Sequence, residues 1–238
     1  MKTAARTLIK IYKKLYGAFG PQRWWPGDTA FEVMIGAVLT QNTAWSNVEK
    51  AIRNLRSAGL LNQKKFAAVP VKRLALLIRP SGYYNMKAMR LKNAMTYIDR
   101  NFGGSLKKLF ALETAELRKT LLGINGIGQE TADSIILYAA EKPVFVVDAY
   151  TKRIFSRHRI IPGDASYEAV QKLFMSNLPK KTRLYNEYHA LIVKLGKDFC
   201  KKSKPNCKAC PLKSILPTDH HHARRVHAGR VDAGREGV

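Results

Sequence analysis

A short glycine-rich turn at residues 123–128 constrains the fold of this chain more than any other feature. Its three glycines, Gly123, Gly126 and Gly128, separate two runs of residues with helical periodicity. Glycine tolerates positive φ and lets a ligand approach the backbone closely, so these positions predict a tight turn between two helices. A helix that begins directly after Gly128 presents unpaired backbone N–H groups outward, which suits the binding of a phosphate oxygen.

A carboxylate follows this turn after about twenty residues. Asp148 comes directly after the apolar residues Phe145, Val146 and Val147, so we expect it at the edge of a buried environment. An aspartate before the helix expected over 149–158 is also a common helix cap, and capping alone is the alternative interpretation. The two roles are compatible, because a capping aspartate stays ionised.

Together these residues resemble the helix-hairpin-helix, Gly/Pro…Asp superfamily of DNA glycosylases, the relatives of endonuclease III. The matching residues are Gly123-Ile-Asn-Gly126-Ile-Gly128, Thr131-Ala132 and Val147-Asp148, and the resemblance covers roughly residues 20–216. A glycine hairpin alone also occurs in polymerases and ligases. The hairpin, the spaced aspartate and a cysteine cluster near the C-terminus make the resemblance specific. It implies two helical lobes with a DNA-binding cleft between them.

Periodicity predicts an all-α protein, because no alternating strand pattern of any length occurs. We expect helices over 3–18, 30–39, 46–58, 70–78, a long run ending at 102, 105–111, 113–122, 129–140, 149–158, 165–177 and 182–199. Residues 28–133 are expected to form a helical barrel domain with the helix-hairpin-helix. Residues 1–27 and 134–216 would form a second helical domain with an iron–sulfur-type loop. Residues 217–238 lack apolar periodicity and predict a disordered tail.

The net charge of +25 indicates a nucleic-acid partner. The last 22 residues carry four basic and three acidic side chains, so the excess belongs almost entirely to the rest of the chain. The resemblance makes the partner double-stranded DNA containing a damaged base. No apolar run reaches membrane-spanning length, and we expect a monomeric cytoplasmic protein with no membrane partner.

The resemblance assigns catalysis to Asp148, whose carboxylate would stabilise the oxocarbenium ion formed on base loss or activate water. Endonuclease III enzymes that also nick the strand carry a lysine in Gly-x-Gly-x-Lys-Thr-Ala, and the matching residue here is Glu130. A carboxylate cannot form the Schiff base of the lyase step. The sequence therefore predicts base removal in base excision repair without strand cleavage.

The base pocket resembles that of the 3-methyladenine DNA glycosylase branch. Trp24, Trp25 and Trp45 would enclose the base, and Glu130 would favour a cationic one. Indole faces attract the charge of 3-methyladenine by roughly 0.5–2 kcal/mol. The alternatives are core packing for the tryptophans and a solvent-facing first-turn acid for Glu130. For the whole chain, two alternatives stay open: a glycosylase for oxidised pyrimidines or mismatched T or U, and a non-catalytic DNA-binding module.

Two loops are candidates for insertion into the duplex. In the family, the glutamine matching Gln41 fills the space left by a flipped base, and the turn before the long helix enters opposite that base. Tyr83 and Tyr84 lie in that turn. The alternatives are a loop that caps a helix for Gln41 and packing beneath the turn for the tyrosines.

The only three cysteines are Cys200, Cys207 and Cys210, which match three positions of the family's Cys-x6-Cys-x2-Cys-x5-Cys motif. Leu216 occupies the fourth position and cannot bind metal. The resemblance predicts a [4Fe–4S] or related cluster. The open options are an iron that lacks a protein thiolate, a substitute histidine from 220–222, a [3Fe–4S] form and a degenerate site. The loop lysines Lys201, Lys202 and Lys204 would contact DNA phosphates.

Overall fold

The computed structural model describes residues 2–22, 24–25 and 27–215, and over these residues it contains helices and turns but no strand. The expectation of an all-α protein is therefore confirmed. Leu216, the histidines at 220–222 and the predicted tail over 217–238 lie outside the described residues. No described helix has both the length and the apolar character needed to cross a membrane.

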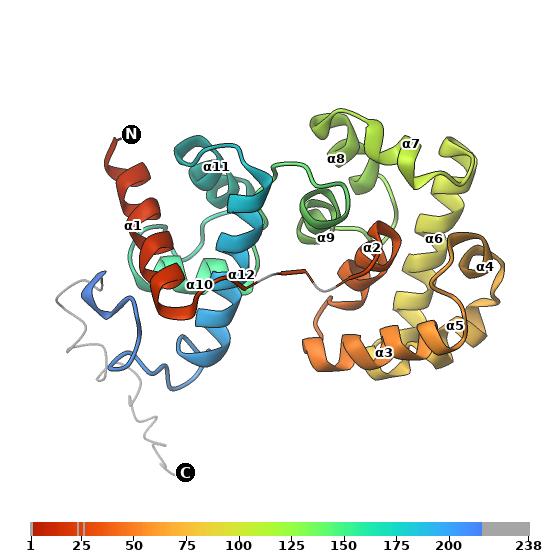
Figure 1. Cartoon of the computed structure of the whole chain (residues 1–238), viewed down its shortest axis with the longest axis horizontal. Helices are drawn as coiled ribbons and strands as arrows, with labels where there is room; N and C mark the ends of the chain where they lie inside the picture. The colour runs from red at the N-terminus through yellow and green to blue at the C-terminus, as the bar shows by residue number, and fades with distance from the viewer. Residues whose placement is uncertain (1, 23, 26, 216–238) are drawn as a thin grey trace, which may run out of the picture.

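One lobe is built around α2 (Ala30–Leu39), in which every residue from Phe31 to Leu39 is buried. A helix that is apolar on all sides belongs in a core. Thr29 starts it by accepting a hydrogen bond of 3.1 Å from the backbone N–H of Glu32. The surrounding elements are α3 (Trp45–Ser57), α4 (Gln63–Ala68), α5 (Val71–Leu77), η1 (Arg79–Ser81), α6 (Tyr84–Phe102), α7 (Leu106–Ala111), α8 (Thr114–Leu122), α9 (Gln129–Ser134) and the π-helical η2 (Ile135–Ala139) (Figure 1).

The other lobe combines the two ends of the described chain. It contains α1 (Lys2–Phe19), α10 (Ala149–Arg157), α11 (Tyr167–Asn177), α12 (Thr182–Asp198) and the short η3 (Lys213–Ile215) (Figure 1). Leu8, Ile11 and Leu15 form the buried face of α1, at the spacing of one helical stripe. Tyr188 on α12 donates to the carbonyl of Leu8 at 2.8 Å, which fixes α1 against α12.

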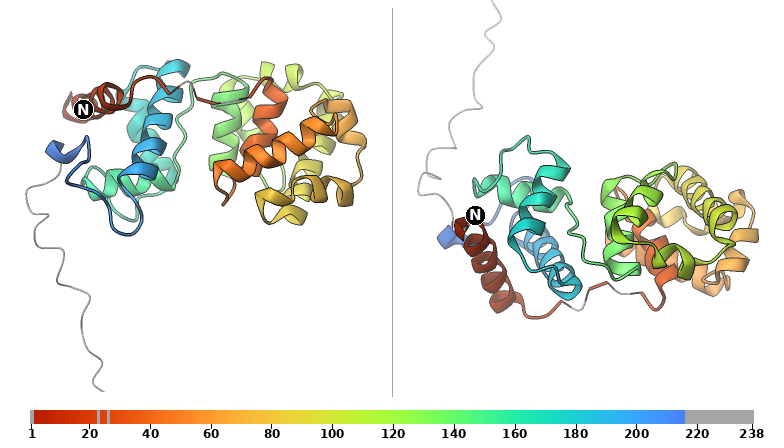
Figure 2. Two further views of the ribbon diagram at one scale, coloured as in Figure 1. Left: turned by 60° about the horizontal axis from the view of Figure 1, so that its bottom comes forward. Right: turned by 90° about the horizontal axis from the view of Figure 1, so that it is seen from above.

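Two connections cross between the lobes. The segment between α1 and α2 carries Trp24 and Trp25, and the segment between η2 and α10 ends at Asp148 (Figures 1 and 2). Both crossings place residues of predicted function at the junction of the lobes. The fold therefore explains how segments more than a hundred residues apart reach one site.

A buried polar network also joins the lobes. Asp133 is fully buried on α9, and Arg118 on α8 donates to its carboxylate from Nε at 2.7 Å and from Nη2 at 3.1 Å. Tyr167 and Gln171 on α11 donate to the same carboxylate at 2.8 Å and 2.7 Å. The Tyr167 hydroxyl accepts from the Val147 N–H at 3.4 Å. The hairpin helix is thus tied to the residue before Asp148.

The expected helices agree closely with those of the structure, with one omission. α4 has six residues and buries only Phe66, which is too little apolar pattern to indicate a helix. The run over 129–139 continues from α9 into η2, which packs against α2. The suggested domain boundary after residue 133 falls inside this run, and the division into domains stays a prediction.

Candidate active site

A cleft of about 1220 Å³ lies between the lobes and collects most of the residues singled out from the sequence. Both lobes line it, and its lysines come from α12 and from the loop that follows α12. The predicted residues in its walls are Trp24, Trp25, Gln41, Trp45, Gly126, Gly128, Glu130, Asp148, Lys201 and Lys202. The remaining ones, Tyr83, Tyr84, Gly123, Lys204 and the three cysteines, lie outside the lining of the cleft.

Asp148 is both a helix cap and a buried carboxylate. It precedes α10, and its Oδ1 accepts from the backbone N–H of Thr151 at 2.7 Å and from the Thr151 hydroxyl at 2.8 Å. Burial by itself raises the pKa of a carboxyl group. At Asp148 the interaction with His189 and the two bonds from Thr151 outweigh burial, so its pKa lies below the ordinary value. The carboxylate is therefore ionised at neutral pH.

His189 faces the other oxygen of this carboxylate and was not anticipated from the sequence. Its Nε2 lies 3.5 Å from Asp148 Oδ2, and its Nδ1 lies 2.5 Å from the Tyr138 hydroxyl. With the proton on Nε2 towards Asp148, Nδ1 accepts from Tyr138. Burial and then the charge of Asp148 raise the pKa of Tyr138, so the hydroxyl keeps its proton. The available signal was a histidine inside the apolar run Tyr188–Val193.

The three tryptophans form one aromatic cluster beside this carboxylate. The ring centroids of Trp25 and Trp45 are 5.0 Å apart, and those of Trp24 and Trp45 are 5.6 Å apart. Trp25 also packs against Tyr138 at 5.0 Å, next to Gly36, where an added Cβ would lie 3.3 Å from the indole. All three tryptophans are half-buried. They pack against the core, as the alternative interpretation expected, and they also line the cleft, so a role in enclosing the base stays a prediction.

Glu130 stands in the first turn of α9 and lines the same cleft. Its side chain is open to the solvent of the cleft but has protein around it on most sides. Partial removal of water and then the negative charge of Asp148 raise the pKa of Glu130 to about 7, and His189 acts in the opposite direction. Glu130 therefore changes charge near neutral pH, within the electrostatic range of Asp148.

The hairpin needs glycine at fewer positions than the sequence suggests. Only Gly126 has a positive φ, of 95°, and a Cβ there would lie 2.2 Å from Cγ of Arg90. Gly123 ends α8 with φ of −72°, and Gly128 precedes α9 with φ of −91°. A Cβ on Gly128 would meet no atom within 4 Å. The backbone is thus open to a ligand at Gly128, while Gly126 shapes the turn.

Gln41 is held by two hydrogen bonds to the hairpin and by a third from Arg90 on α6. Its Nε2 donates to Gly126 O at 3.2 Å and to Thr131 Oγ1 at 2.8 Å, and Arg90 donates to its Oε1. The second candidate loop separates its two tyrosines. Tyr83 is 68% exposed and has φ of 45°, whereas Tyr84 is half-buried against the core. Tyr83 is therefore the more accessible of the two tyrosines, Tyr84 packs as the alternative expected, and insertion by either loop stays a prediction.

The cysteine loop is anchored by two arginines of α10. Arg153 donates to Cys200 O at 2.8 Å, and Arg157 donates to Cys200 Sγ at 3.3 Å and to Lys201 O at 2.7 Å. Arg157 also donates to Lys202 O at 2.8 Å. These bonds hold the part of the loop that carries Lys201 and Lys202 at the cleft.

The cysteines do not by themselves fit a four-thiolate cluster. Cys200 and Cys210 are buried and Cys207 is exposed. Burial raises the pKa of Cys210. The hydrogen bond from the Leu212 N–H acts in the opposite direction, and the charges of Cys200 and Cys207 raise the pKa further, so the three thiols are neighbours. Within the described part of the chain, no group of three His, Cys, Asp or Glu residues is placed to hold a metal ion. The cluster stays a prediction, and no step below depends on it.

Comparison with known proteins identifies the family. Residues 35–180 match the model of the HhH-GPD superfamily of base excision DNA repair proteins. This chain belongs to that superfamily. It is a DNA glycosylase of the superfamily, which confirms the resemblance seen in the sequence.

Individual relatives agree with this assignment. A protein of Methanocaldococcus jannaschii named as a DNA repair glycosylase is 50% identical over 209 residues, which is 87% of this chain and 94% of the relative. Endonuclease III of Thermotoga maritima is 29% identical and the match covers 88% of this chain and 89% of that protein.

Two solved structures share the fold. The 3-methyladenine DNA glycosylase of H. pylori bound to 1,N6-ethenoadenine is 32% identical, with a TM-score of 0.70 over 82% of this chain and 97% of that one. An endonuclease III–DNA complex superimposes with a TM-score of 0.74 over 89% of this chain and 94% of that one. It is 22% identical and supports the fold alone.

Proposed function

We propose that this glycosylase binds double-stranded DNA, turns an alkylated purine such as 3-methyladenine into the cleft, and releases it by hydrolysis of the N-glycosidic bond. One observation carries the proposal. An ionised carboxylate, Asp148, lines the same cleft as three clustered tryptophans. That combination provides a negative charge for the sugar and aromatic surface for the base.

The carboxylate acts on the charge that develops as the bond breaks. Departure of the base leaves positive charge on the deoxyribose, and a fixed anion nearby stabilises it or draws a proton from the attacking water. The two bonds from Thr151 fix the orientation of the carboxylate, and His189 supports its ionised form. These neighbours position the group before the reaction begins, so little reorganisation is required.

The aromatic cluster supports selection of a cationic base. The charge of 3-methyladenine is delocalised, and electron-rich indole faces attract it. Glu130, when ionised, adds negative charge to the same cleft. The likeness to the H. pylori 3-methyladenine DNA glycosylase, at 32% identity, points to the same substrate class.

Strand cleavage is not part of the proposed reaction. The Schiff base of the lyase step needs an amine, and Glu130 stands where the resemblance to endonuclease III places a lysine. We therefore propose a monofunctional enzyme that leaves an intact abasic strand, and that acts as a monomer.

Contacts with DNA phosphates would come from the rims of the cleft. Lys201 and Lys202 line it from the anchored loop, and Lys197 lines it from α12. The open backbone at Gly128 offers N–H groups on the hairpin side. The excess of basic residues agrees with binding that weakens as salt rises.

The test is base release from methylated duplex DNA, followed by chromatography of free bases and by gel analysis of the strands with and without alkali. The proposal predicts free 3-methyladenine and strand breaks only after alkali. Strand breaks without alkali would refute the monofunctional assignment. Release from DNA with oxidised pyrimidines or T·G mismatches, but not from methylated DNA, would favour an endonuclease III-like substrate range. Binding without release from any of them would indicate a DNA-binding module.

A further inference from the structure

Lys87 is a buried lysine that the proposed chemistry does not use. It lies in the first turn of α6 and is 1% exposed. Its Nζ donates to Leu39 O at 2.7 Å, to Thr43 Oγ1 at 2.8 Å and to Ser81 O at 2.7 Å. A lysine ammonium has three N–H donors, so all three are used.

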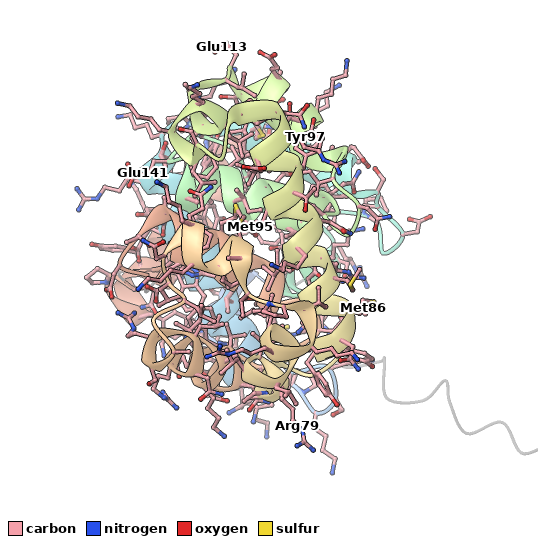
Figure 3. The ribbon with its side chains drawn as sticks, turned by 90° about the vertical axis from the view of Figure 1, so that its right-hand side faces the viewer. Arg79, Met86, Met95, Tyr97, Glu113 and Glu141 are labelled. Carbon is pink, nitrogen blue, oxygen red and sulfur yellow. The ribbon has the colours of Figure 1, made fainter. Side chains whose placement is uncertain are left out.

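The three acceptors lie in or directly beside the two candidate insertion loops, since Leu39 ends α2 and Ser81 ends η1. Leu39 and Thr43 flank Gln41, and Ser81 lies two residues before Tyr83. The Thr43 hydroxyl also donates to Ser81 O, so the loops contact each other directly. One turn further along α6, Arg90 donates to Gln41. The start of α6 therefore contacts both loops; Met86 in the first turn of α6 and Arg79 in η1 are labelled in Figure 3.

Burial disfavours the charged form of Lys87, so we take the role of the ammonium to be the positioning of its three acceptors. Burial and then the nearby charge of Arg90 lower the pKa of Lys87 to about 8, which still leaves the ammonium largely protonated at neutral pH. A neutral apolar side chain would fill the same space without that cost. It would not bring three oxygens from two separate loops to one point.

We propose that Lys87 is a positioning residue that holds the Gln41 loop and the Tyr83 turn in one arrangement, so that both side chains enter the duplex together. This inference rests on the proposed function, since it gives both loops a place in the DNA. It makes no claim about the chemistry at Asp148. Loss of Lys87 is therefore expected to impair base flipping and to leave Asp148 and the three tryptophans in place.

The chain offers a matched control on the same helix. Lys92 also donates to backbone carbonyls, those of Phe66 at 3.3 Å and of Ala67, but these belong to α4 and not to the insertion loops. Lys92→Met removes a second set of lysine–carbonyl hydrogen bonds within the same lobe. It reports the effect of lost stability without lost loop alignment.

The primary assay is the fluorescence of 2-aminopurine placed opposite an abasic-site analogue in duplex DNA, which rises when inserted side chains unstack it. Wild type and Lys92→Met should give the full rise at saturating protein, and Lys87→Met a small fraction of it. Release of 3-methyladenine should fall about 10- to 100-fold in Lys87→Met alone, as misplaced substrate geometry predicts. Thr43→Val, which removes one acceptor and the direct bridge to Ser81, should be intermediate and serves if Lys87→Met does not fold.

The results separate the two claims. Equal fluorescence for Lys87→Met and Lys92→Met, or no rise with wild type, would overturn the role of Lys87. A fluorescence rise that depends on Lys87, with no base released by wild type, would support the positioning role and refute the proposed function.

Discussion

Removal of His189 should change the acid side of the pH–rate profile. The imidazole of His189 stabilises the ionised form of Asp148. His189→Leu removes this interaction and fills the buried position on α12 with an apolar side chain. A hydrogen bond to a charged group contributes about 1.5–3 kcal/mol. The 3.5 Å separation between His189 Nε2 and Asp148 Oδ2 is too long for a full hydrogen bond, so this contact should contribute about 1.4 kcal/mol, just below that range. Since one pKa unit corresponds to about 1.36 kcal/mol, the pKa of Asp148 should rise by about one unit.

The direction of the pH shift follows from the fact that the ionised form of Asp148 is the one that catalyses base release. The lowered pKa of Asp148 keeps the carboxylate ionised as the pH falls, so a rise in pKa moves the loss of activity to higher pH. The acid limb of the rate of base release should shift upward by about one pH unit in His189→Leu, with a smaller change at pH 7. The free energy of unfolding of His189→Leu should fall for the same reason. The lowered pKa of Asp148 stabilises the folded state at pH values above the pKa of the unfolded chain, and the variant loses part of this contribution.

The assay is single-turnover base release from methylated DNA between about pH 3 and pH 8, corrected for the release measured without enzyme. Tyr138→Phe is the matched control, since it breaks the bond to Nδ1 and leaves Nε2 facing Asp148. Its acid limb should move less than that of His189→Leu. An unmoved acid limb in His189→Leu would refute the role given to the imidazole.

Two further predictions concern binding and stability. Lys201→Ala and Lys204→Ala should each weaken binding to all DNA sequences and reduce the salt dependence of affinity by about one phosphate contact. Titration at several salt concentrations measures this slope, and an unchanged slope would argue against phosphate contacts. Arg118→Met should leave the buried Asp133 carboxylate without its cation and cost about 3 kcal/mol, or roughly 6–12 °C in a thermal melt. The exposed Arg100→Met should change stability by less than about 0.5 kcal/mol, and equal losses would contradict the network.

Local features of the fold were predictable from the sequence because their causes are local. The apolar residues from Phe31 to Leu39 predict a core helix, and α2 has the expected bounds. Asp148 before a helical run predicts a cap, and Thr151 completes it. The short α4 was missed because a single buried residue, Phe66, gives no period.

The partners of the site were not predictable in the same way. His189 meets Tyr138 from 51 positions away, and Gln41 meets Gly126 from 85 positions away. No periodicity encodes such pairs, because the first joins the two lobes and the second joins two separate loops of one lobe. Lys87 could be placed on a helix from its neighbours, but its burial depends on two loops that only the folded chain brings together.

The most direct test of the account is base release by Asp148→Asn. Asparagine is also a good helix cap, so the substitution removes the charge and keeps an oxygen for the Thr151 N–H. We predict that release of 3-methyladenine at pH 7 falls by about 10²–10³-fold or more, while affinity for methylated duplex DNA stays within about twofold of wild type. Release at the wild-type rate would contradict the assignment of Asp148 as the catalytic carboxylate.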